Sequence, residues 1–104
     1  MKRFAFKMKL KPGTVAEYKK RHDEIWPELS DVIRAAGIAD YSIFLDEETL
    51  TLFAVQKQAA ANTVAELPNH PVVQRWWAFM APLMEVHPDN SPQCVALPEV
   101  FHLD

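Results

Sequence analysis

The start of the sequence alternates between apolar and basic side chains, and this constrains the fold more than any other feature. The apolar series is Phe4, Phe6, Met8 and Leu10, and the basic series is Arg3, Lys7, Lys9 and Lys11. Successive side chains of a strand point to opposite faces, so a period of two predicts a strand with one buried and one solvated face. Such a strand requires a sheet beside it and a layer of other elements against its apolar face.

A helical segment is expected next, over 14–37. Pro12-Gly13 ends the strand, and Thr14 followed by Glu17 predicts a capping box at the start of the helix. One broad face of this helix carries Val15, Tyr18, Ile25, Trp26, Leu29, Val32 and Ile33. Pro27 is expected to kink the helix or to start a new segment, and Gly37 to close it in a left-handed conformation.

The rest of the chain predicts two more strands, a second helical layer and a last strand. The expected elements are strands over 41–46 and 50–56 joined by a turn at 46–48, a helical stretch over 59–67 that stops at Pro68, a second one from Pro71 towards Met84 that Pro82 bends or ends, a loop over 87–92 and a short strand over 99–103. The order β-α-β-β-α-β predicts one α+β domain over 1–104. Its simplest packing is a ferredoxin-like antiparallel sheet with the helices on one face.

The second face of that sheet is also expected to be partly apolar. Phe44, Phe53 and Val55 lie on the opposite parity to part of the core set. A single copy of a chain this small would leave them exposed, so the sequence predicts a homodimer.

Composition excludes several classes of function. The net charge of −3 argues against a nucleic-acid partner, because phosphate binding requires a basic surface. No stretch approaches the ~20 apolar residues of a membrane span, and the alternating N-terminus is unlike a signal peptide. Cys94 is a lone cysteine and cannot form an intramolecular disulfide, so a cytoplasmic setting is expected. The histidines and Cys94 show no metal-ligand spacing, and two glycines cannot form a phosphate-binding loop.

His22 is unusual because it lies near the centre of the apolar helix stripe, between Tyr18 and Ile25. Tyr18 and His22 are four residues apart, which places their Cβ atoms about 5–6 Å from each other. The histidine could be a structural residue that bonds a backbone carbonyl or Tyr18, and the helical pattern alone favours this role slightly. It could also be an acid–base catalyst, since its ordinary pKa of about 6.5 suits proton transfer near neutrality.

Trp76, Trp77 and Tyr41 are candidates for a ligand pocket. Adjacent tryptophans on a helix diverge by about 100°, so both can line a pocket only from its flanks. Aromatic faces suit the C–H faces of a sugar, and indole or phenol groups can bond its hydroxyls. Core packing explains these residues as well. Asp89 and Asn90 could cap a site, although turn chemistry explains them almost equally.

The whole chain resembles the L-rhamnose mutarotase family. The resemblance rests on Tyr18-Lys-Lys-Arg-His22-Asp-Glu-Ile-Trp26-Pro27-Glu28-Leu29, Tyr41-Ser-Ile-Phe-Leu-Asp46, Gln74-Arg75-Trp76-Trp77, Pro88-Asp89-Asn90-Ser91-Pro92 and Glu99-Val100-Phe101. It implies a homodimeric, cytoplasmic α+β barrel that interconverts the anomers of L-rhamnose without a metal or organic cofactor. The family's proton donor falls on His22, and its sugar-binding positions fall on Tyr18, Tyr41, Trp76 and Trp77.

The resemblance gives the chemistry a concrete form. As an imidazolium, His22 would protonate the ring oxygen, while a second group or water handles the anomeric hydroxyl. Two alternatives remain: a cofactor-free or haem-degrading monooxygenase on the same kind of dimeric α+β barrel, and a non-catalytic sugar-binding module.

Overall fold

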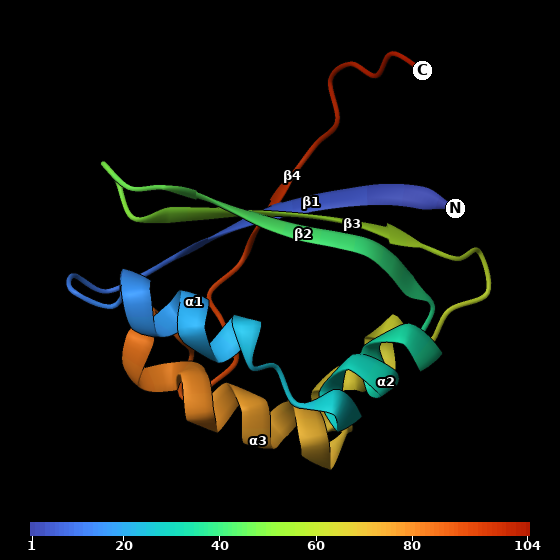
Figure 1. Cartoon of the computed structure of the whole chain (residues 1–104). Helices are drawn as coiled ribbons and strands as arrows, with labels where there is room; N and C mark the ends of the chain where they lie inside the picture. The colour runs from blue at the N-terminus through green and yellow to red at the C-terminus, as the bar shows by residue number, and fades with distance from the viewer.

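An antiparallel sheet of four strands, with all the helices on one face, forms the molecule (Figure 1). The computed structural model describes residues 1–104. Its elements are β1 (Lys2–Lys9), α1 (Val15–Asp23), α2 (Pro27–Ala35), β2 (Ile38–Asp46), β3 (Thr51–Gln58), the 3₁₀ helix η1 (Val64–Asn69), α3 (Pro71–Met80), the 3₁₀ helix η2 (Ala81–Leu83) and β4 (Val95–Leu97). The strand order is β2-β3-β1-β4, and every neighbouring pair is antiparallel. The expected α+β class and antiparallel sheet are confirmed.

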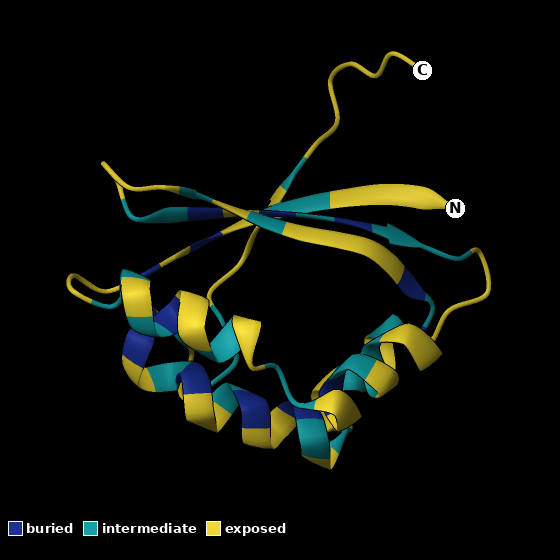
Figure 2. Cartoon of the chain, viewed as in Figure 1, coloured by how far each residue is buried: buried dark blue, intermediate teal, exposed yellow.

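The core lies between the sheet and the helices, as the burial colours show (Figure 2). On β1 and β3, Phe6 pairs with Ala54 and Met8 pairs with Leu52, and all four side chains point to the helical side. The buried core consists of Met8, Leu10, Tyr18, Leu29, Leu52, Ala54, Val73, Trp76, Met80, Leu83 and Met84. The period-two pattern of the first strand therefore buries Met8 and Leu10 and half-buries Phe6, as expected, whereas Phe4 at the start of the strand remains 44% exposed.

Pro27 divides the first helical segment into two helices. It is the first residue of α2, and Trp26 before it is extended, with φ −61° and ψ 127°. A proline ring pushes the preceding residue out of the helical region, so α1 has to end before Trp26. Two helices at different angles can cover more of the sheet than one straight helix, and they turn His22 and Leu29 towards the same core.

The capping box predicted at Thr14 does not form. Thr14 is the residue before α1, but its hydroxyl donates to the carbonyls of Lys11 (2.7 Å) and Leu83 (3.0 Å), and it bonds no helix N–H. Glu17 instead accepts from Arg21 at 3.1 Å along the helix. The hydroxyl connects the start of α1 to η2, a long-range contact that the local pattern cannot reveal.

Two further predictions were wrong in position. The helical stretch expected over 59–67 is η1, which begins at Val64 and contains Pro68. The side chain of Asn62 forms a local turn, because it donates to the Ala59 carbonyl and accepts from the N–H of Val64. This turn delays the start of the helix.

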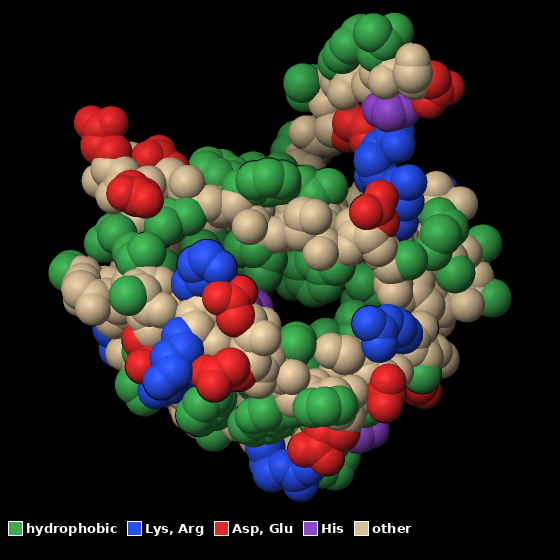
Figure 3. All heavy atoms as spheres, viewed as in Figure 1, with side chains coloured by type: hydrophobic (Ala, Val, Ile, Leu, Met, Phe, Trp, Pro, Cys, Tyr) green, Lys and Arg blue, Asp and Glu red, His purple; other side chains and the backbone are tan.

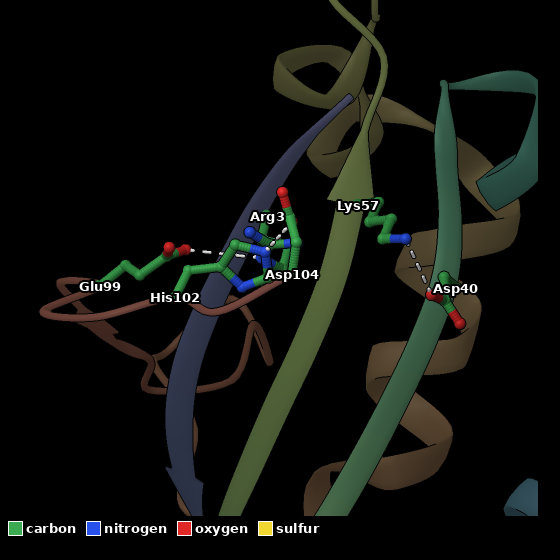
Figure 4. A network of polar contacts seen from close by, with 6 residues as sticks. All are labelled: Arg3, Asp40, Lys57, Glu99, His102 and Asp104. Atoms are coloured by element: carbon green, nitrogen blue, oxygen red, sulfur yellow. Dashed lines mark hydrogen bonds and ion pairs between the residues drawn. The ribbon is translucent and has the colours of Figure 1, made fainter.

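The strand predicted over 99–103 is also wrong, because the strand lies at Val95–Leu97. There Lys7 pairs with Val95 and Ala5 with Leu97, so the free edge of β1 is already occupied. The tail that follows projects away from the sheet and is held by an ion pair of 3.6 Å between Arg3 and Glu99 (Figures 1 and 4).

The face of the sheet that turns away from the helices has an apolar centre, which we call the outer sheet face. It consists of Phe44, Phe53, Val55 and Val95. Phe44 and Phe53 are direct cross-strand partners, and they remain 63% and 37% exposed. No helix covers this face in the single chain (Figure 1). Its position agrees with the parity predicted from the sequence.

Gly37 provides a test of the junction between α2 and β2. Its φ of +99° is strained for an L side chain, and a Cβ there would lie 2.8 Å from the Cβ of Asn62. We expect Gly37→Ala to lower the free energy of unfolding by about 2 kcal/mol, measured by urea denaturation. Gly13→Ala is the control, because its φ is +79° but its Cβ would meet nothing within 4 Å. Equal losses in the two variants would contradict the steric argument.

Candidate active site

A cavity of about 1000 Å³ lies between the sheet and the helices. Figure 3 shows the hollow from the side, with hydrophobic side chains on its walls. All five site residues predicted from the sequence line it, namely Tyr18, His22, Tyr41, Trp76 and Trp77. They come from α1, β2 and α3, so the fold brings them together from three separate parts of the chain.

His22 is held by the turn of α1 that precedes it. Its Nδ1 lies 3.1 Å from the backbone carbonyl oxygen of Tyr18, and its ring lies against the Tyr18 ring with centroids 4.3 Å apart. A carbonyl oxygen only accepts, so Nδ1 carries the proton and donates it. Nε2 makes no hydrogen bond within the protein, and no buried side-chain nitrogen or oxygen lacks a partner, so Nε2 is accessible from the cavity. Nδ1 therefore holds the ring in place, while Nε2 is left free to meet a ligand.

The surroundings of His22 favour the uncharged ring. Burial lowers the pKa of His22 below its ordinary value, and the Tyr18 carbonyl and the Asp23 carboxylate oppose this only in part. A neutral ring with its proton on Nδ1 has a lone pair on Nε2, which accepts a proton. The imidazolium expected from the sequence stays a prediction, and the burial that works against it could not be read from the sequence.

Tyr18 is almost fully buried, yet its hydroxyl has no partner in the protein. The residue is 8% exposed, and the absence of unpaired buried polar atoms means that the hydroxyl is accessible from the cavity. Burial raises the pKa of Tyr18 well above its ordinary value, with smaller contributions from Tyr41 and Cys94. The phenol therefore stays protonated and can donate.

Tyr41 faces the cavity from the same side of β2 as Ile43 and Leu45, and an irregularity in the strand lies beside it. The register shifts between Ala39 and Ser42, and Asp40 has a φ of +51°. After this bulge the Tyr41 ring lies edge-on to Phe6 of the inner face, with centroids 6.5 Å apart. An ion pair of 3.3 Å between Lys57 and Asp40 connects the bulge to β3 (Figure 4). Tyr41 is 38% exposed, but it lies inside the open cavity, and burial raises its pKa to about 12.

Trp76 serves the core and the cavity together. It is 9% exposed and packs edge-on against two rings. The centroid of its ring lies 5.1 Å from that of Trp26 and 5.4 Å from that of His22. Trp77 is half-buried and lines the same cavity. Neither indole N–H has an acceptor within the protein, and neither is sealed from the cavity. Both can therefore donate to a ligand hydroxyl.

Comparison with known proteins identifies the family. The family model described as L-rhamnose mutarotase matches residues 3–103. The chain belongs to the L-rhamnose mutarotase family. It is 59% identical to an L-rhamnose mutarotase of Jannaschia sp. (strain CCS1), covering 99% of both chains, and 56% identical to one of Bacteroides thetaiotaomicron, covering 100% of both. The crystal structure of an L-rhamnose mutarotase from Formosa agariphila matches with a TM-score of 0.94 at 49% identity, over 100% of both chains.

Gln56 is a cavity residue of this family member that the sequence analysis missed. It lies on the inner face of β3 and is 4% exposed. Its Oε1 accepts from Gln58 Nε2 at 2.8 Å, while its own amide N–H₂ donates to no protein group. The signal was present in the sequence, because period two places Gln56 on the same face as Leu52 and Ala54. A polar residue at a core position is often there for a ligand.

Of the two residues in the loop over 87–92 that could cap a site, only Asn90 lines the cavity. Asn90 lines the cavity from a left-handed conformation with φ +71°, and its N–H donates to the His87 carbonyl at 2.9 Å. Asp89 does not line the cavity. Its carboxylate accepts from the N–H and the hydroxyl of Ser91, and these bonds lower its pKa. Asp89 therefore stabilises the turn that presents Asn90.

No group of three or more His, Cys, Asp or Glu side chains is arranged to hold a metal ion. None of the helices combines the length and hydropathy that crossing a lipid bilayer requires.

Proposed function

We propose that this chain interconverts the α and β anomers of L-rhamnose and that His22 moves a proton in that reaction. The observation that carries the proposal is the accessible Nε2 of His22 in a cavity lined by aromatic rings, in a chain of the L-rhamnose mutarotase family. A ring nitrogen that is free to exchange a proton, beside rings that can hold a sugar, supplies one of the proton transfers that anomer exchange needs.

The sugar-binding part of the proposal assigns Tyr18, Tyr41, Trp76 and Trp77 to the substrate. The indoles offer apolar faces for the C–H groups of the pyranose and N–H groups for its hydroxyls. Trp76 is fixed by its packing on Trp26, so it can hold a sugar without losing much side-chain freedom on binding. The reaction needs the sugar held still while the C1–O5 bond opens, the C1–C2 bond rotates and the ring closes on the other face.

The proposed assembly is a homodimeric α+β barrel in the cytoplasm. Pairing two outer sheet faces would cover Phe44 and Phe53, which a monomer leaves exposed. The tail after β4 carries three more apolar side chains that a monomer leaves exposed, namely Val100, Phe101 and Leu103, which are 93%, 78% and 79% exposed. The lone Cys94 fits a reducing compartment, and the net charge of −3 fits a protein that binds no nucleic acid.

Saturation-transfer NMR on L-rhamnose, with and without the protein, tests this function. We expect the protein to speed exchange between the two anomeric protons well beyond the spontaneous rate. No acceleration, together with a visible spectral change on adding haem or a quinol, would favour the monooxygenase alternative. Thermal stabilisation by rhamnose without faster exchange would favour the sugar-binding module.

A further inference from the structure

Anomer exchange needs two proton-transfer groups close together. When the pyranose opens, the anomeric oxygen O1 loses a proton and the ring oxygen O5 gains one, and both oxygens are bonded to the same carbon, C1. The second group therefore has to be a neighbour of His22. This reasoning rests on the mutarotase function proposed above.

Of the two aromatic rings that lie beside His22, only that of Tyr18 carries a group that can exchange a proton. The rings nearest to His22 are Tyr18 at 4.3 Å and Trp76 at 5.4 Å, and an indole N–H does not act as an acid or a base under these conditions. Asp23 follows His22 in the sequence, but it pairs with Lys19 at 2.8 Å and is 62% exposed. The carboxylate of Asp23 is therefore held at the surface.

We propose that Tyr18 is a catalytic residue that protonates O5 while Nε2 of His22 takes the proton from O1. The C1–O5 bond breaks with its electron pair on O5, which receives the phenol proton. O1 becomes the aldehyde oxygen as its proton moves to His22. After rotation about C1–C2, the Tyr18 phenolate takes the proton back from O5–H, and the His22 imidazolium returns its proton to the aldehyde oxygen as the ring closes.

The ground state holds both groups in the forms that this step requires. The Tyr18 hydroxyl has no protein partner to compete with O5, and the bond from His22 Nδ1 to the Tyr18 carbonyl keeps the lone pair on Nε2. The groups that shift the pKa values of the pair are Tyr41 from β2, Cys94 before β4 and Asp23 on α1. Two cations, Lys19 on α1 and Arg34 on α2, also line the cavity, but their side chains are 76% and 74% exposed and pair with Asp23 and Asp31. Once the protons have moved, the adjacent phenolate and imidazolium attract each other.

Tyr18→Phe removes only the hydroxyl, and because that hydroxyl bonds nothing in the protein, the fold is expected to remain intact. We expect kcat to fall by about a hundredfold or more with little change in KM, as for loss of a general acid. The matched variant is Tyr41→Phe, which should mainly raise KM. A Tyr18→Phe chain with wild-type kcat, or with a change in KM alone, would overturn the proposal. The function itself fails only if the wild-type chain does not accelerate exchange.

The pH dependence of kcat gives a second test that does not depend on removing the hydroxyl. The base has to be neutral, so kcat should fall as the pH falls through the lowered pKa of His22, and it should stay level to about pH 10 because the phenol remains protonated. The chain has two tyrosines, so growing the Tyr41→Phe variant on 3,5-difluorotyrosine labels Tyr18 alone.

Fluorination makes the phenol more acidic, so an alkaline decline in kcat should appear within the measurable range. The double variant Tyr18→Phe, Tyr41→Phe has no tyrosine to label, and it should show no such decline under the same growth conditions. If the labelled chain keeps a level kcat across the pH at which its fluorophenol ionises, followed by ultraviolet absorbance, Tyr18 is not the acid.

Discussion

The His22→Asn chain is expected to lose most of its acceleration of anomer exchange, with kcat lower by about 10²–10⁴-fold. The asparagine amide can still donate to the Tyr18 carbonyl, as Nδ1 does at 3.1 Å. It cannot accept a proton as Nε2 can, so the substitution removes the chemistry while it preserves the local helix contact. The measurement is saturation-transfer NMR on L-rhamnose, corrected for the spontaneous rate.

A matched control keeps this prediction specific to the cavity. His87→Asn makes the same chemical change in a side chain that does not line the cavity, and it should leave kcat unchanged. Rhamnose binding by the His22→Asn chain, followed by thermal stabilisation, should persist because the aromatic walls are intact. Wild-type exchange in the His22→Asn chain would refute the catalytic role.

The second large effect is expected at the outer sheet face. Phe53 pairs with Phe44 on one side and with Lys7 on the other, so Phe53→Lys adds a charge to the apolar centre and places it beside another lysine. A twofold dimer contains the change twice. If each substituted residue at the centre of the interface weakens the dimer by about 2 kcal/mol, the dimer Kd should rise about 10³-fold. Analytical ultracentrifugation over a range of concentrations measures it.

The control for this prediction lies on the helical side of the molecule. Ala78 is exposed on α3, away from the outer sheet face, so Ala78→Lys should leave the dimer intact. A Phe53→Lys chain that remains dimeric at low concentration, or a wild-type chain that is monomeric, would contradict the proposed assembly.

Local patterns predicted the elements whose boundaries depend on nearby residues. Period two in the first strand, Pro27 between α1 and α2, and the left-handed Gly37 all act over a few residues. Two of the errors arise where a partner distant in the sequence determines the structure. The hydroxyl of Thr14 bonds Leu83, and the edge of β1 pairs with 95–97 and leaves no place for 99–103.

In the site too, features with a local cause could be predicted from the sequence, and features with a distant cause could not. The helical spacing of Tyr18 and His22 predicted their contact, but the protonation state of the imidazole depends on burial by the opposite layer. Tyr41 faces the cavity because it alternates with Ile43 and Leu45, which the sequence shows, whereas the bulge beside it at Asp40 has no clear signal in the sequence. Gln56 could have been found, since it is the polar member of an otherwise apolar series on β3.

The bond between His22 and the Tyr18 carbonyl has a consequence for redesign of the pocket. The acceptor belongs to the main chain, so any residue that keeps α1 helical would preserve the orientation of the imidazole. The nitrogen proposed to move the proton and the side chains proposed to bind the sugar can therefore be varied separately. Libraries at positions 41, 56 and 77 could seek other aldoses while the proton acceptor stays in its place.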